Sequence, residues 1–225
     1  DEPGRRADLC SLLDLLIAGY SWQIYRVSSE NKFRYFSLAF VLISLGMMFK
    51  MITSGILYFS PAQVVANSIL VPVTQGNVVY NDLLYRAGFF LQMVTMLGGL
   101  LLIFFVSQKS RARLTKFYEV SQIGLFIYLI VLISIVSSFK YFVFYMTSMV
   151  ILGMIVLNYY KNYLNTNRSK NARLVMTSFF LVLVSQFCFV FVLLWEQAYV
   201  VGEVLFLLGF LILLYTYRKI TMVKY

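Results

Sequence analysis

Long apolar runs separated by short polar segments fill this chain from residue 9 to residue 217. A helix needs roughly 20 apolar residues to cross the bilayer core of about 30 Å, and seven runs meet or approach that length. They cover residues 9–25, 36–59, 87–107, 117–139, 141–160, 174–195 and 198–217. The pattern predicts an all-α membrane protein, a bundle of seven transmembrane helices in which residues 1–225 form a single transmembrane domain.

The connections between these runs are short, with one exception. Residues 60–85 form the longest, where Pro61, Pro72 and the Gly76-Asn77 turn signal interrupt helix, so a surface loop is expected there. A second polar connection is expected over residues 161–173. The fourth and fifth runs are separated only by a tight connection around residues 138–140, but the combined run is far too long for one crossing, so two helices are predicted.

Basic residues concentrate in alternate connections. They are Arg26, Lys32 and Arg34; Lys109, Arg111, Arg113 and Lys116; Lys161, Arg168, Lys170 and Arg173; and Arg218, Lys219 and Lys224 in the tail. The intervening connections hold almost none. Because cytoplasmic loops carry the excess of Lys and Arg, the rich connections are predicted to be cytoplasmic. The sequence therefore predicts a multi-pass protein of the cell membrane with its N-terminus outside and its C-terminus in the cytoplasm.

The composition limits the kinds of binding site and activity that the protein can have. Charged residues make up 12% of the chain, against roughly a quarter in soluble domains, and 61% of residues are hydrophobic. The net charge of +10 comes from the connections, so it indicates membrane topology and not a nucleic-acid partner. There is no His, which excludes His-based metal sites and His-based general bases. We expect no cofactor, no metal and no enzymatic activity.

The first three runs echo the last three. Ile17-Ala18-Gly19 aligns with Ile151-Leu152-Gly153, Arg34 and Phe40 align with Arg173 and Phe179, and Leu97-Gly98 aligns with Leu208-Gly209. In that register Gln92 falls opposite Glu203. The alignment predicts a parallel 3+1+3 internal repeat, with repeat A over about residues 9–107, a linker helix over about 117–139 and repeat B over about 141–217.

This order of helices resembles the broad group of seven-helix proteins that includes PQ-loop transporters, sugar-efflux transporters and microbial rhodopsins. The Gly202–Tyr215 segment is also similar to small archaeal seven-helix proteins. The resemblance implies a 3+1+3 architecture across the whole chain. It does not carry over an activity, because the chain lacks the Pro-Gln dipeptide of the PQ-loop family, and its seventh span lacks the lysine that binds retinal in rhodopsins.

Five polar side chains lie in the predicted outer halves of spans. They are Asp14, Lys50, Gln92, Gln186 and Glu203. Ionisable residues within a span are costly and face the bundle interior or water. Lys50 with Asp14 or Glu203 would form a compensating pair, since the first, second and seventh helices of a closed ring are neighbours. The hypothesis is an outward-facing polar pocket that binds a small molecule; the alternative is a set of interhelical contacts that fix packing.

Three functions remain open at this point. The first is a seven-helix sensor or ligand-binding module, the second a small-solute or ion carrier, and the third an accessory subunit of a membrane complex. The expected partners are membrane lipid, a small-molecule ligand, and a protein that binds the basic cytoplasmic loops.

Overall fold

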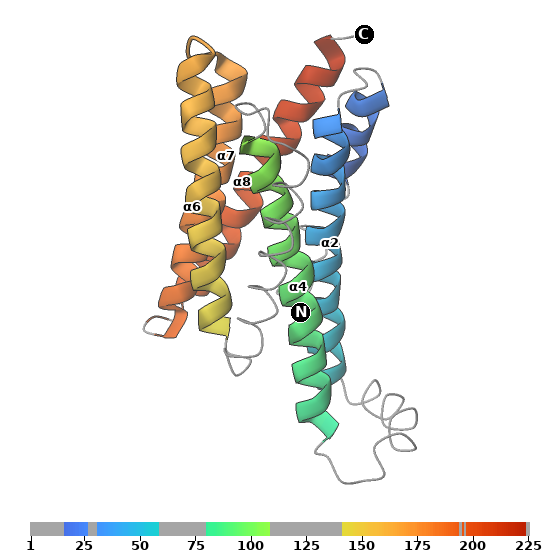
Figure 1. Cartoon of the computed structure of the whole chain (residues 1–225). Coiled ribbons are helices and arrows are strands. Elements are labelled where there is room, and N and C mark those ends of the chain that lie inside the picture. The colour runs from blue at the N-terminus through green and yellow to red at the C-terminus, as the bar shows by residue number, and fades with distance from the viewer. Residues whose placement is uncertain are drawn as a thin grey trace.

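The computed structural model describes residues 16–26, 31–58, 80–108, 141–193, 195 and 197–223. All of its regular elements are helices (Figure 1). After a helical segment over residues 16–26 come α2 (Asn31–Tyr58), α4 (Tyr80–Gln108), α6 (Tyr141–Asn165), α7 (Lys170–Val190), the short 3-10 helix η1 (Phe191–Leu193) and α8 (Gln197–Val223).

Five of these helices are long and apolar enough to cross a membrane. The stretches concerned are Phe33–Thr53, Arg86–Gln108, Tyr141–Asn165, Lys170–Val190 and Gln197–Lys219. The predicted all-helical, multi-pass membrane protein is therefore confirmed at this level. The predicted fourth span, over 117–139, and the first part of the first span lie outside the described residues.

Several helices extend beyond their apolar runs. Residues 80–85, expected in a loop, belong to α4. The connection between α6 and α7 shrinks from the expected 161–173 to residues 166–169, where Asn167 and Arg168 take left-handed φ angles of 49° and 58°. The hydroxyl oxygen of Ser169 then caps α7 by accepting the Ala172 N–H at 3.3 Å. The expectations failed here because backbone hydrogen bonds continue into polar sequence once a helix is anchored by its apolar part.

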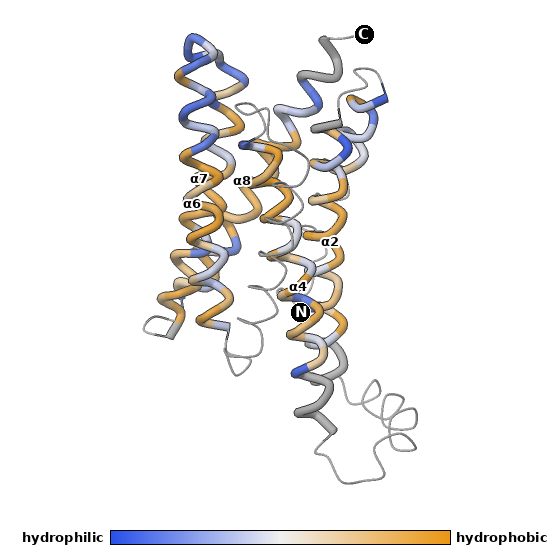
Figure 2. The backbone as a smooth tube through the Cα atoms, in the orientation of Figure 1, coloured by the Kyte–Doolittle hydropathy of each residue, from blue (hydrophilic) through white to orange (hydrophobic). Residues whose placement is uncertain are grey.

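Hydropathy follows the long axis of the bundle (Figure 2). The middle of the helices is hydrophobic, and the turn between α6 and α7 is hydrophilic. That turn, the C-terminal part of α8 and the start of α2 all lie at one end of the bundle (Figure 1). We call it the basic end, because the exposed basic side chains of these segments gather there. They are Arg34, Lys161, Arg168, Lys170, Arg173, Arg218 and Lys219.

Two helix pairs approach each other most closely, α2 with α4 and α7 with α8. Both approaches depend on a glycine. A Cβ on Gly99 of α4 would lie 2.7 Å from the carbonyl oxygen of Ala39 in α2. A Cβ on Gly209 of α8 would lie 2.9 Å from the carbonyl oxygen of Ser178 in α7. In each pair the absent side chain lets the two backbones meet, as is common between membrane helices.

Other glycines of these helices differ in whether they lie at a helix contact. Gly46 does contact α4, since its Cβ would lie 3.2 Å from the Cβ of Met96. Among the residues that the structure describes, a Cβ on Gly98 or Gly153 would meet nothing within 4 Å. A glycine supports a close contact only on the face of its helix that is turned to a partner.

The remaining contacts join these pairs into one bundle. The Ser37 hydroxyl of α2 donates to the Ala18 carbonyl oxygen at 2.8 Å, which ties the 16–26 segment to α2. Helices α4 and α6 are bonded near both ends, by the Tyr141 hydroxyl donating to Gln92 and by the Asn158 amide donating to Ser107. Helix α8 starts beside α7 and runs obliquely toward α2, so it crosses the middle of the bundle (Figure 1).

Candidate ligand-binding site

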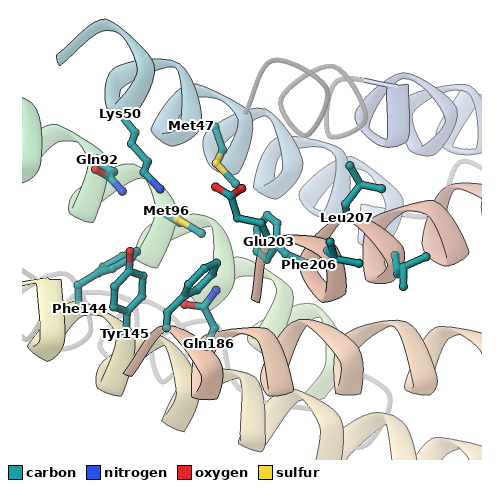
Figure 3. A pocket seen from close by; sticks show the side chains of 13 residues that line it. Met47, Lys50, Gln92, Met96, Phe144, Tyr145, Gln186, Glu203, Phe206 and Leu207 are labelled. Atoms are coloured by element: carbon teal, nitrogen blue, oxygen red, sulfur yellow. The ribbon is translucent and has the colours of Figure 1, made fainter. Parts of the chain in front are cut away.

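Four of the five predicted site residues line one cavity (Figure 3). Lys50 comes from α2, Gln92 from α4, Gln186 from α7 and Glu203 from α8. Four different helices thus bring polar groups to one place in an otherwise apolar bundle. Asp14, the fifth predicted residue, lies outside the described residues. We call this cavity the Lys50 pocket; its volume is about 220 Å³.

Lys50 lies within the apolar part of α2, three residues before that stretch ends at Thr53. Its side chain extends from α2 into the pocket, toward the space that the Glu203 carboxylate enters from α8 (Figure 3). The ammonium nitrogen also lies 5.8 Å from the centre of the Tyr199 ring. A cation above an aromatic face gains electrostatic stabilisation, and this lowers the cost of placing the charge inside a span.

Glu203 is half-buried on the second turn of α8. The Tyr199 hydroxyl interacts with its carboxylate from one turn earlier on the same helix. Tyr199 therefore touches both charged groups, the lysine through its ring and the glutamate through its hydroxyl. This arrangement places one positive and one negative group on the same pocket, so the lining as a whole is close to neutral.

The side-chain amides of Gln92 and Gln186 differ in their hydrogen bonding. The side-chain oxygen of Gln92, which is 3% exposed, accepts a hydrogen bond from the Tyr141 hydroxyl at 3.3 Å. The side-chain oxygen of Gln186, which is 1% exposed, has no hydrogen-bond partner among the residues that the structure describes. Buried acceptors almost always have a donor, so this oxygen is an exception beside the cavity.

Most of the remaining lining is apolar or aromatic. It consists of Met47, Met96, Phe144, Tyr145, Phe189, Val204, Phe206, Leu207 and Leu208. A few polar groups in a mainly apolar cavity are typical of small-molecule sites. The volume is below the roughly 300–1,000 Å³ of pockets for drug-sized ligands, so the space suits a small solute.

Sequence reasoning missed the aromatic side chains beside the charges. The Tyr145 ring lies 5.1 Å from Phe189, and Phe189 lies 5.7 Å from Tyr199. These rings belong to α6, α7 and α8, so only tertiary packing brings them together. Their sequence signal was weak, because an aromatic residue near a span end is as well explained by an interface belt.

Two tyrosines near the ends of spans face the bundle interior and not a membrane interface. Tyr217 is 7% exposed, whereas Tyr215 of the same helix is 59% exposed. The ring of Tyr159, which is half-buried, stacks on Phe179 at 5.0 Å and 7°. Position relative to the span end predicts depth in the membrane, but the face of the helix decides between lipid and interior.

Within the described part of the chain, no three His, Cys, Asp or Glu side chains group as a metal site would require. No protein-family model matches the chain, and no curated protein or solved structure is significantly similar to it. Functional interpretation therefore rests on the Lys50 pocket and its surroundings.

Proposed function

We propose that this integral membrane protein is a seven-helix sensor or ligand-binding module whose site is the Lys50 pocket. The observation that carries the proposal is the convergence of polar side chains from α2, α4, α7 and α8 on one cavity. Contacts that served packing alone would meet one another's hydrogen bonds. Among the described residues the Gln186 oxygen does not follow this pattern, since it has no hydrogen-bond partner.

The lining favours a small ligand that carries both a carboxylate and an ammonium group on an apolar body. Lys50 suits the carboxylate, and Glu203 suits the ammonium. The methionine, leucine and phenylalanine side chains suit the apolar body. A neutral amino acid such as leucine has this chemistry.

We place the N-terminus outside and the C-terminus in the cytoplasm. The basic end of the bundle supports this orientation, because exposed Lys and Arg from three separate connections gather there. The Lys50 pocket lies toward the opposite end and would face the outside. A sensor passes its signal to another protein, and the basic end is the surface we assign to that partner.

The 3+1+3 repeat is part of the proposal. Ala39 and Ser178, the carbonyl partners of the two glycine contacts, have the same sequence spacing as Arg34 and Arg173. The contacts also favour a small change of register in the third helix of each repeat, where Gly99 and not Gly98 takes the place of Gly209. We define the first half as residues 16–26 with α2 and α4, and the second half as α6, α7 and α8.

Thermal unfolding of the detergent-purified protein tests the site. The probes are leucine, which has both charges, hexanoate, which has the acid alone, and hexylamine, which has the amine alone. A ligand that binds the folded state raises the unfolding midpoint, with about 2.7 kcal/mol of stabilisation at a hundredfold excess over Kd. We expect leucine to give the largest shift.

Two variants test which side chain binds which charged group of the ligand. Lys50→Met is expected to abolish the shift with hexanoate, and Glu203→Gln the shift with hexylamine, because each removes the opposite charge. Met48→Leu is the matched control, since Met48 is 42% exposed on another face of α2. The proposed site is wrong if no probe shifts the midpoint, or if the shifts survive in both variants.

A further inference from the structure

A second cavity lies at the basic end of the bundle. Its volume is about 230 Å³, and it is lined by Phe33, Phe36, Val106, Ser107, Tyr159, Asn162 and Tyr217. We call it the Tyr217 pocket. The Ser107 hydroxyl oxygen at its wall accepts a hydrogen bond from the Asn158 amide at 3.1 Å. The lining mixes hydroxyl, amide and aromatic groups, so it tolerates a polar solute.

Helices α2, α4, α6 and α8 border both pockets, and α7 borders the Lys50 pocket as well. Helix α2 contributes Lys50 to the Lys50 pocket and Phe36 to the Tyr217 pocket. Helix α8 contributes Glu203 to the Lys50 pocket and Tyr217 to the Tyr217 pocket. Helices α4 and α6 also contribute to both. From Phe36 to Met47 along α2 the rise is about 16 Å at 1.5 Å per residue. The pockets therefore lie one above the other along one axis, on either side of the bundle's middle.

A column of aromatic rings separates them. The Phe206 ring, which lines the Lys50 pocket, lies 4.6 Å from Phe210, and Phe210 lies 6.0 Å from Phe40 of α2. Phe40 lies 4.8 Å from Phe36, which in turn stacks on Tyr217 at 5.1 Å. All five rings are at most 7% exposed. The column leads from one pocket to the other, along the seam between α2 and α8.

The seam is built differently from the interfaces within each half. Within the halves, glycines let the backbones meet, as Gly99 does against Ala39 and Gly209 against Ser178. Across the seam α2 and α8 meet through rings and make few close backbone approaches. Rings slide and change rotamer more readily than backbones locked by glycine, so the seam is where the halves would move relative to each other.

We propose that the protein carries its ligand across the membrane, with the Lys50 pocket and the Tyr217 pocket as the two ends of one path and the Phe40–Phe210 contact as its barrier. The proposal rests on the Lys50 pocket being a ligand site. It adds that the ligand leaves toward the basic end when the rings separate. The class of cargo is the same small solute with an acid, an amine and an apolar body.

Cysteine accessibility tests the path without requiring that the ligand be known. In a background with Cys10→Ser and Cys188→Ala, a single cysteine replaces Met47 in the Lys50 pocket or Asn162 in the Tyr217 pocket. If Met47→Cys does not fold, Met96→Cys takes its place as the reporter in the Lys50 pocket. A charged, membrane-impermeant methanethiosulfonate is applied to intact cells and, separately, to inverted vesicles. Met48→Cys, next to Met47 but exposed on the outside of α2, measures the background.

A carrier visits conformations open to each side, so both pocket cysteines are expected to react from both membrane faces, severalfold faster than Met48→Cys. Reaction of either cysteine from one face alone, or from neither, overturns transport. The thermal shift with leucine is measured on the same variants. If that shift persists while two-sided labelling is absent, the protein is a ligand-binding module and not a carrier.

A separate variant tests whether the Phe40–Phe210 contact is the barrier. Phe210→Ala removes the ring that links Phe206 to Phe40, and is expected to speed the labelling of Met47→Cys from the basic end severalfold. Phe40→Leu is the milder variant if Phe210→Ala does not fold. An unchanged rate in a folded variant overturns the assignment of the barrier to this contact. The last measurement is uptake of labelled leucine into proteoliposomes. We expect uptake with the wild-type protein and none with Lys50→Met.

Discussion

The two halves of the bundle share a packing frame but differ in chemistry. In the first half Gly99 rests against the α2 backbone at Ala39, and in the second half Gly209 rests against the α7 backbone at Ser178. The polar groups of the Lys50 pocket do not follow this pattern. Lys50 of α2 has an aromatic residue, Phe189, at the matching spacing in α7. A contact between two helix backbones requires small residues at only a few positions. The neighbouring positions can therefore take the side chains that a binding site needs.

The largest effect is expected from filling the first-half contact. In Gly99→Leu the new Cβ would meet the Ala39 carbonyl oxygen at 2.7 Å and the Ile43 side chain at 2.6 Å, so α2 and α4 must separate. We expect a loss of about 3 kcal/mol or more in unfolding free energy, at or beyond the usual range for overpacking. Denaturant titration in detergent micelles measures it.

Gly98→Leu is the matched control. A Cβ at Gly98 meets nothing within 4 Å among the described residues, and removal of a helical glycine adds stability of up to about 1 kcal/mol. We therefore expect Gly98→Leu to equal or exceed the wild type in stability. Equal losses in the two variants would show that α4 does not meet α2 through Gly99.

A smaller change tests whether the second half obeys the same rule. Gly209→Ala adds one methyl group 2.7 Å from a Val182 side-chain carbon and 2.9 Å from the Ser178 carbonyl oxygen. We expect it to cost about 1–2 kcal/mol, and Gly99→Ala to cost a similar amount. Gly153→Ala, with open space around its Cβ, should be neutral or stabilising. A harmless Gly209→Ala beside a costly Gly99→Ala would break the equivalence of the halves.

Span positions were predictable from the sequence because about 20 apolar residues in a row admit few interpretations. The convergence of Lys50, Gln92, Gln186 and Glu203 was also predictable, since polar groups inside spans turn toward the interior and these four share a depth. All four do line one cavity. Whether they bind a ligand stays a prediction.

Other features depend on information that a single sequence does not hold. The Tyr217 pocket arises because α8 crosses from α7 to α2, and this crossing is set by side-chain fit along three helices. Likewise, Gly98 and Gly99 are adjacent and chemically identical, yet only Gly99 faces α2. A rotation of one residue about the helix axis decides between them, and apolar residues on every side of α4 leave that rotation undetermined.

The smallest expected effect compares two buried serines, one in each half. Ser37 of α2 donates to the Ala18 carbonyl oxygen at 2.8 Å, whereas the hydroxyl of Ser185 in α7 has no hydrogen-bond partner in the described part of the chain. Replacing a bonded hydroxyl loses a net contribution of about 1 kcal/mol, while replacing an unbonded buried one removes a desolvation cost. Ser37→Ala should therefore destabilise the protein by about 1 kcal/mol, and Ser185→Ala should stabilise it by a similar or smaller amount.

The sign of the difference matters more than its size. Both changes remove one oxygen from a fully or nearly fully buried side chain, so transfer and packing terms largely cancel between them. Parallel denaturant titrations measure the two differences under one condition. If Ser185→Ala loses as much stability as Ser37→Ala, then Ser185 has a donor or acceptor in the folded protein. The same measurement on Gln186→Leu would then show whether the neighbouring Gln186 oxygen, which also lacks a partner among the described residues, is bonded in the folded protein.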